Sequence, residues 1–221
     1  MVAYSLVGML SVAGLHVANT NGGRRMVVHH SSTDVPSPTV AVRTSAEALR
    51  KTLVRRYPSW SPQAEAQESA VQSVIDGIVD FGEIARRSLG PHWDPLSDNE
   101  RQQFVLLLQK IIERSPLDKS LHVDPDSTIK YEREQIADNE AVVSSVVTTS
   151  VHSGGATRHP VQYRLSLKAG RWRIHDIVVN DVSLVDGYHA QFTKIIARDT
   201  FDGLLRRMRK KLGEMPSLGA N

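Results

Sequence analysis

The chain has 221 residues, of which 40% are hydrophobic and 23% are charged, a balance typical of a globular protein with its own core. The formal net charge is only +3. A nucleic-acid-binding protein usually has a dense basic face, so we expect no nucleic-acid partner. The sequence contains no cysteine, which excludes disulfides, a thiol nucleophile, thiolate metal sites and a lipoprotein anchor.

Residues 1–18 are largely apolar and are typical of the hydrophobic region of an export signal. Ser11 and Ala13 have the spacing that a signal peptidase prefers, and Ala18 is a second candidate end. No Lys or Arg precedes the run, a defect that a start codon placed too far downstream would explain. We expect a cleavable signal peptide over 1–18, with a short membrane anchor or a disordered tail as the alternatives.

Residues 19–43 are rich in Asn, Gly, Ser, Thr and Pro and are expected to form a disordered linker. Thr44-Ser45-Ala46-Glu47 has the pattern of a capping box, so the first helix should begin there. The sequence thus predicts one folded domain over 44–213, followed by a disordered tail at 214–221.

Five more helices are expected along the chain. Ser61-Pro62 predicts an N-cap with proline in the first turn. Asp80 is expected to cap a short helix that ends at Gly90, and Ser97 opens a second capping box with Glu100. Two closing helices are expected around 184–197 and 201–212.

Beyond Pro125 the hydrophobic period changes from helical to two. Residues 142–151 are rich in β-branched side chains, and 161–168 alternate between apolar and polar. Ala169-Gly170 predicts a tight turn into another strand. The residues expected on one face of that strand are Trp172, Ile174, Asp176 and Val178. The fold class predicted is α+β: N-terminal helices, a curved antiparallel sheet of about four strands, and C-terminal helices.

Catalytic and metal-binding patterns are weak. Asp80, Asp176 and Asp181 are best interpreted as cap and turn residues, because nothing else marks them as paired acids. The histidines lack metal-ligand spacing, and no Gly-x-Ser-x-Gly nucleophile elbow or glycine-rich phosphate loop occurs. We therefore expect no metal, no cofactor and no enzymatic activity.

The strongest charge run lies near the C-terminus. Its members are Arg206, Arg207, Arg209, Lys210 and Lys211. They can complement the dipole at the end of a helix, or they can dock an acidic partner or an anionic membrane surface. We expect them to serve partner docking.

Two segments carry a resemblance to a known family. The first includes Asp80-Phe81, Leu89-Gly90 and Trp93, and continues to Phe104. The second is longer and runs through Trp172-Arg173-Ile174-His175-Asp176, Val182-Ser183-Leu184-Val185 and Tyr188-His189-Ala190-Gln191-Phe192. In order and spacing, these segments resemble the MlaC family over roughly residues 46–212.

The resemblance implies a phospholipid carrier and not an enzyme. The family shuttles glycerophospholipid through the periplasm of Gram-negative bacteria and so maintains outer-membrane lipid asymmetry. Its partners are an outer-membrane lipoprotein complex and an inner-membrane complex of an MCE-domain protein with an ABC transporter. The acyl chains would lie in an apolar cavity between sheet and helices, with the headgroup near solvent. The candidate lipid-binding residues are Phe81, Trp93, Phe104, Leu108, Tyr163, Leu165, Trp172, Val178, Val182 and Tyr188.

The sequence departs from the family pattern at four places. Asp181 and Thr200-Phe201 stand where glycine is usual, Gly187 replaces an asparagine, and His189 replaces an arginine. The last change puts in doubt any headgroup or partner contact normally made by that arginine.

Two other functions stay open at this point. One is an enzyme of isomerase or hydratase type on a similar cone of helices and sheet, with Asp176 or Tyr163 as acid or base. The other is an interaction module with a filled core that docks through the basic C-terminal run. A deep apolar cavity without buried ionisable groups would favour the carrier. A buried carboxylate with a strongly raised pKa would favour the enzyme, and the absence of a cavity would favour the interaction module.

Overall fold

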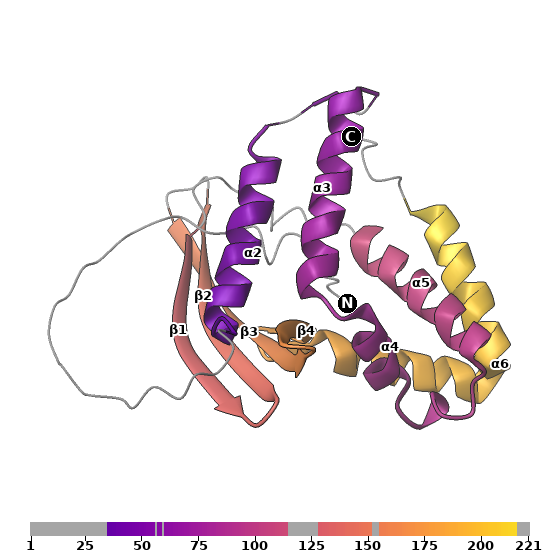
Figure 1. Cartoon of the computed structure of the whole chain (residues 1–221). Helices are drawn as coiled ribbons and strands as arrows, with labels where there is room; N and C mark the ends of the chain where they lie inside the picture. The colour runs from indigo at the N-terminus through magenta and orange to yellow at the C-terminus, as the bar shows by residue number, and fades with distance from the viewer. Residues whose placement is uncertain (1–34, 56, 59, 115–127, 152–154, 216–221) are drawn as a thin grey trace, which may run out of the picture.

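The computed structural model describes residues 35–55, 57–58, 60–114, 128–151 and 155–215. The predicted signal peptide, most of the predicted linker and residues 216–221 of the predicted tail lie outside this part of the chain. The described residues confirm the α+β fold: a five-stranded antiparallel sheet that does not close into a barrel, with helices packed against it (Figure 1).

The helices are α2 (Pro38–Leu53), α3 (Pro62–Ile78), α4 (Phe81–Leu89), the 3-10 helix η1 (Gly90–His92), α5 (Asp98–Arg114) and α6 (Leu184–Glu214). The strands are β1 (Thr128–Ala137), β2 (Glu140–Val151), β3 (Gly155–Lys168), β4 (Arg171–Val179) and β5 (Val182–Ser183). They pair in chain order as a meander. None of the described helices combines the length and the apolar character needed to span a bilayer.

The first helix begins at Pro38, so the prediction that it begins at Thr44 is wrong, and 38–43 are helical and not part of a linker. The Ser37 side chain accepts a hydrogen bond from the Val40 amide at 3.3 Å, and Pro38 occupies the first helical position. This is the usual combination of a serine cap and an N1 proline. The start of α2 is hard to predict from sequence because the preceding segment has the composition of a linker.

The other predicted caps are confirmed. Ser61 Oγ accepts from the Ala64 amide, and Asp80 Oδ1 accepts from the Glu83 amide at 2.9 Å. Ser97 and Glu100 form the reciprocal capping box at the start of α5. Gly90 has a φ of +53°, a conformation that suits the end of α4.

The alternation of apolar and polar residues along β4 predicts the wrong face for part of this strand. In the β3–β4 pair, Leu165 lies opposite Ile174 but Arg164 lies opposite Asp176, so His175 is an extra residue at a β-bulge. The bulge places Trp172 and Ile174 on one face and Asp176 and Val178 on the other. The prediction that all four share a face is therefore wrong.

The long helix α6 contains a kink at Thr200, where φ is 63° and ψ is 176°. This conformation is essentially reserved for glycine. The kink divides α6 into the two closing helices that the sequence predicts. It also explains why glycine is usual here in the family pattern.

Asp181 is the second departure from glycine, and it too has a positive φ, of 64°. It forms the β4–β5 turn together with Asn180, whose φ is 47°. Asn and Asp tolerate this region better than other side chains because their short polar groups bond locally. The backbone strain caused by a residue other than glycine is thus smaller at Asp181 than at Thr200.

Candidate functional site

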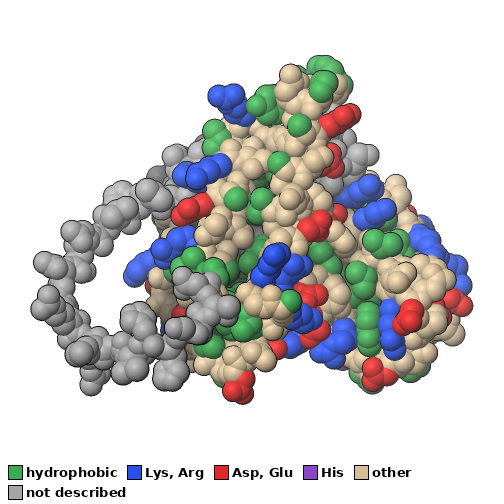
Figure 2. Space-filling model, in the orientation of Figure 1, with side chains coloured by type: hydrophobic (Ala, Val, Ile, Leu, Met, Phe, Trp, Pro, Cys, Tyr) green, Lys and Arg blue, Asp and Glu red, His purple; other side chains and the backbone are tan. Residues whose placement is uncertain are grey.

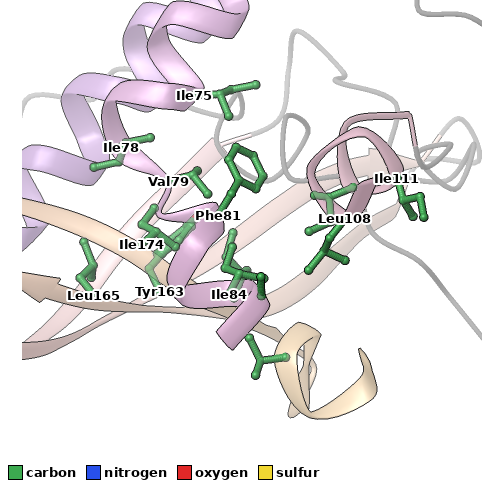
Figure 3. Close-up of a cluster of buried hydrophobic side chains, with 14 of the residues drawn as sticks. Ile75, Ile78, Val79, Phe81, Ile84, Leu108, Ile111, Tyr163, Leu165 and Ile174 are labelled. Atoms are coloured by element: carbon green, nitrogen blue, oxygen red, sulfur yellow. The ribbon is translucent and has the colours of Figure 1, made fainter. Parts of the chain in front are cut away.

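A continuous apolar cluster fills the space between the sheet and the helices. In Figure 3, Phe81 lies between Ile75 and Val79 of the α3 end and Tyr163 and Ile174 of the sheet. Helix α5 contributes Leu108 and Ile111 from the other side (Figure 3). This is the place where the candidate lipid-binding residues were expected to meet.

Most of those candidates do meet there. Six belong to the buried cluster: Phe81, Phe104, Leu108, Tyr163, Leu165 and Trp172. Trp93 and Tyr188 are half-buried and pack against it. Val178 lies on the opposite face of β4 because of the bulge at His175. Val182 lies apart in β5, with 61% of its surface exposed.

An aromatic group joins α5 to both halves of α6. The Phe104 ring meets the Phe192 ring edge-on at 5.4 Å between centroids and lies 6.0 Å from the Phe201 ring. Tyr188 stacks on Phe192 at 5.3 Å. Because Phe192 and Phe201 flank Thr200, these rings fix the angle of the kink.

Tyr163, one of the two acid–base candidates, is fully buried in the cluster. Burial raises the pKa of its hydroxyl far above the usual value. The hydroxyl therefore stays protonated and neutral at physiological pH. A group held in one protonation state is a poor general base.

Asp176, the other candidate, is a buried carboxylate already engaged by three donors. Its Oδ2 accepts from Ser183 Oγ at 2.7 Å and from Arg164 Nη1 at 3.0 Å, and its Oδ1 accepts from the Val185 amide at 3.1 Å. These bonds tie β3 and β4 to the start of α6. The geometry assigns Asp176 a structural role as an anchor for that helix.

Asp176 also lines a pocket of about 300 Å³ whose lining residues are mostly polar or charged. The other lining residues are Arg87, Arg164, His175, Val185, Asp186 and His189. This pocket lies where α4, β3, β4 and the start of α6 meet. The sequence did not predict it, because Arg164 reads as an ordinary exposed residue of an alternating strand.

His175 is buried beside this pocket and bonds to Glu140 through Nε2 at 2.9 Å. Burial holds the pKa of its imidazole below the usual value. Glu140 also accepts from Arg87 at 3.2 Å, and Arg87 donates to Glu83 at 2.8 Å. Bonds from Arg86 and then from Arg87 lower the pKa of Glu83. These polar contacts fasten α4 to the sheet.

His189, which replaces the family's arginine, faces inward. Its Nδ1 lies 3.2 Å from the Ser88 carbonyl oxygen. The ring covers Gly90 so closely that a Cβ atom there would lie 2.8 Å from Cε1. His189 therefore secures the end of α4 against α6, and it also lines the pocket described above.

Helices α3 and α5 are joined by polar side chains. Gln72 Nε2 donates to Glu113 Oε1 at 2.8 Å, and Gln109 Nε2 donates to Asp76 Oδ1 at 3.3 Å. Only Ile75 and Ile78 of α3 are buried. Helix α3 also packs against α2 and places the half-buried Val71 and Val74 against the apolar cluster, so the polar bridge is one of several contacts that hold it.

The basic run lies on the outer face of the second half of α6. All five members are exposed, whereas the intervening Met208 is buried. Arg207 pairs with Asp199, and Arg209 donates to Gln103 at 2.9 Å. The run thus presents cations to solvent, and part of it also ties the kink and α5 together.

In the described part of the chain, no three His, Cys, Asp or Glu side chains are grouped so that they could hold a metal ion.

The arrangement of helices over a meandering sheet can be compared with known proteins. The family described as MlaC protein matches residues 43–210. The chain belongs to the MlaC family. No protein of curated function matches it in sequence.

Among solved structures, a phospholipid-binding protein from Ralstonia solanacearum, in complex with a phospholipid, is similar with a TM-score of 0.68. The two sequences are 19% identical, and the match covers 81% of this chain and 98% of that one. At this identity the similarity shows a shared fold.

Proposed function

We propose that the protein binds phospholipid and carries it through an aqueous compartment. The observation that carries the proposal is the family membership together with a fold shared with a protein that holds a phospholipid. An acyl chain in water costs about 0.8 kcal/mol per CH₂ group, so a carrier must enclose it. Because the apolar cluster fills the space between sheet and helices, the acyl chains would enter it only as the helices move apart.

The route for the acyl chains would run between α3 and α5. Half-buried apolar side chains from both helices pack against the cluster, among them Val71, Val74 and Leu107. The Gln72–Glu113 and Gln109–Asp76 bonds close this side. Separating the two helices exchanges these bonds for bonds to water, so opening costs little polar free energy. The headgroup would remain at the rim.

The finer proposal is the family's shuttle. The protein would exchange glycerophospholipid in the periplasm between an outer-membrane lipoprotein complex and an inner-membrane MCE-domain and ABC-transporter complex. The basic run of Arg206, Arg207, Arg209, Lys210 and Lys211 would steer it toward an acidic partner. Long-range attraction between charges raises association rates and is screened by salt.

An enzyme is the weaker alternative. Asp176 already accepts from three donors that tie it to β3 and α6, and Tyr163 is held protonated, so both acid–base candidates are poorly suited to catalysis. We propose that no bond of the lipid changes.

The first test is lipid extraction and mass spectrometry of the protein purified from a bacterial host. Stoichiometric phospholipid is expected. Protein that carries none, and that also takes up none from vesicles, would contradict the proposal. Stoichiometric zinc, with loss of lipid on chelation, would show that a metal takes part.

The second test separates docking from structure in the basic run. Reversing Arg206, Arg209 and Lys211 to Glu should slow lipid transfer to a partner complex and flatten its salt dependence, while bound lipid stays bound. Lys110→Glu, an exposed change on α5, is the control for a general charge effect. If only the melting temperature changes, the run is structural.

A further inference from the structure

The connection between α2 and α3 carries exposed apolar and aromatic side chains. Trp60 is 85% exposed, Val54 is 72% exposed and Tyr57 is 37% exposed. The cations Lys51 and Arg55 are exposed beside them. These five residues are called the hairpin tip. It lies at the top of the molecule in Figure 1, and hydrophobic and basic atoms are visible in that region in Figure 2.

The hairpin tip is held in shape without burying these side chains. Gln67 of α3 donates to the Thr52 carbonyl at 2.6 Å and to the Arg55 carbonyl at 2.7 Å. The Ser61 amide donates to the Pro58 carbonyl at 2.9 Å. Since backbone bonds and Gln67 fix the turn, the exposure of Trp60 is not needed for folding. Exposed apolar groups of this kind mark interaction surfaces.

The composition of the hairpin tip favours a bilayer as the occupant. Trp and Tyr are the residues enriched at membrane–water interfaces, where an apolar ring and a polar atom are both satisfied. Neither Lys51 nor Arg55 has an ion-pair partner among the described residues, and the first acid after them along the chain is Glu65. Juxtamembrane cations are attracted to anionic headgroups.

The size of the hairpin tip also favours a bilayer over a protein. A stable protein interface uses about 20–30 residues on each side, whereas the hairpin tip offers five at the end of a projecting helix pair. A few interfacial anchors with adjacent cations are enough for reversible membrane contact.

We propose that the hairpin tip inserts Trp60 and Tyr57 into the headgroup region of an anionic phospholipid bilayer, with Lys51 and Arg55 on the lipid phosphates. This concerns how the protein touches a membrane and not what it carries. It also uses a surface separate from the basic run on α6.

Flotation with vesicles tests the proposal, because it follows the protein itself and not the lipid that it extracts. The full chain is mixed with phosphatidylcholine vesicles or with vesicles containing about one quarter phosphatidylglycerol. Binding is expected to the anionic vesicles. Trp60→Ala should weaken it about tenfold, and Lys51→Glu, which changes the charge by two, about thirtyfold. Leu106→Ala, at a 57% exposed position on α5, and Lys110→Glu are the matched controls and should change it less than twofold.

A second readout is quenching of tryptophan fluorescence by brominated lipid. Trp172 is buried and Trp93 is half-buried, so quenching in the wild type should come mainly from Trp60 and disappear in Trp60→Phe. Failure of the wild type to float, or equal binding by Trp60→Ala and Leu106→Ala, would overturn the proposal. Flotation by a protein that carries no lipid would uphold it while contradicting the proposed function.

Discussion

Gly90→Ala is expected to destabilise the protein by about 2–3 kcal/mol. Gly90 has φ +53° and ψ −126°, and an L side chain in such a sparsely populated region costs about 1–3 kcal/mol. The new Cβ would also lie 2.8 Å from Cε1 of His189, so the ring must move. Moving it breaks the bond to the Ser88 carbonyl, worth about 0.5–1.5 kcal/mol. Reduced entropy of the unfolded chain returns about 0.4–1 kcal/mol.

Urea unfolding followed by circular dichroism measures this difference. With a slope of about 1–3 kcal/mol per molar urea, the midpoint should fall by roughly 1 M. Repeating Gly90→Ala in a His189→Ala background separates the two causes, since the ring contact is then gone and only the backbone cost remains. The cost should be about 1 kcal/mol smaller there. Equal costs in both backgrounds would refute the role of His189, and a cost below about 0.5 kcal/mol would refute the backbone argument as well.

Three further changes test other parts of the structure. Thr200→Gly should stabilise the protein by about 0.5–2 kcal/mol in the same unfolding assay, because it relieves a positive φ at a β-branched residue. Asp176→Ala should cost more than about 2 kcal/mol, since it leaves the donors of Ser183 and Val185 without their acceptor; an unchanged midpoint would contradict its role as an anchor. The pKa of Glu83 is lowered in the folded state. Its ionised carboxylate therefore contributes fully to the free energy of unfolding above the unfolded pKa of about 4.3, and this contribution is lost as the pH falls below that value. Glu83→Gln should therefore flatten the loss of thermal stability on acidification, and parallel acid profiles would count against this.

The sequence predicts well those features that a few neighbouring residues determine. Ser61-Pro62, Asp80 and the Ser97–Glu100 box cap their helices as expected, because a cap is a contact over three residues. The start of α2 was missed because Ser37-Pro38 stands in a stretch whose composition resembles a linker.

Contacts between distant segments were not predictable in the same way. The bulge at His175 is set by pairing with β3, and it moves Val178 to the face opposite Tyr163 and Leu165. The apolar and polar alternation along β4 alone does not indicate this bulge. The polar pocket likewise needs Arg87 and Arg164, which are far apart in the chain. The family resemblance identified the fold, whereas the tertiary contacts fixed which candidates lie together.

The polar bridge between α3 and α5 has a consequence for local stability. Helix α3 fully buries only Ile75 and Ile78, keeps Val71 and Val74 half-buried, and meets α5 through amide–carboxylate bonds, so it has less apolar surface to lose than α4 when it lifts away. Such segments open at a free energy far below that of global unfolding. We therefore expect α3, with its turn to α2, to open at a lower free energy than the sheet, α4 and α6. Under the proposed function, this opening would let the protein admit a lipid by moving one element, without loosening the rest of its core.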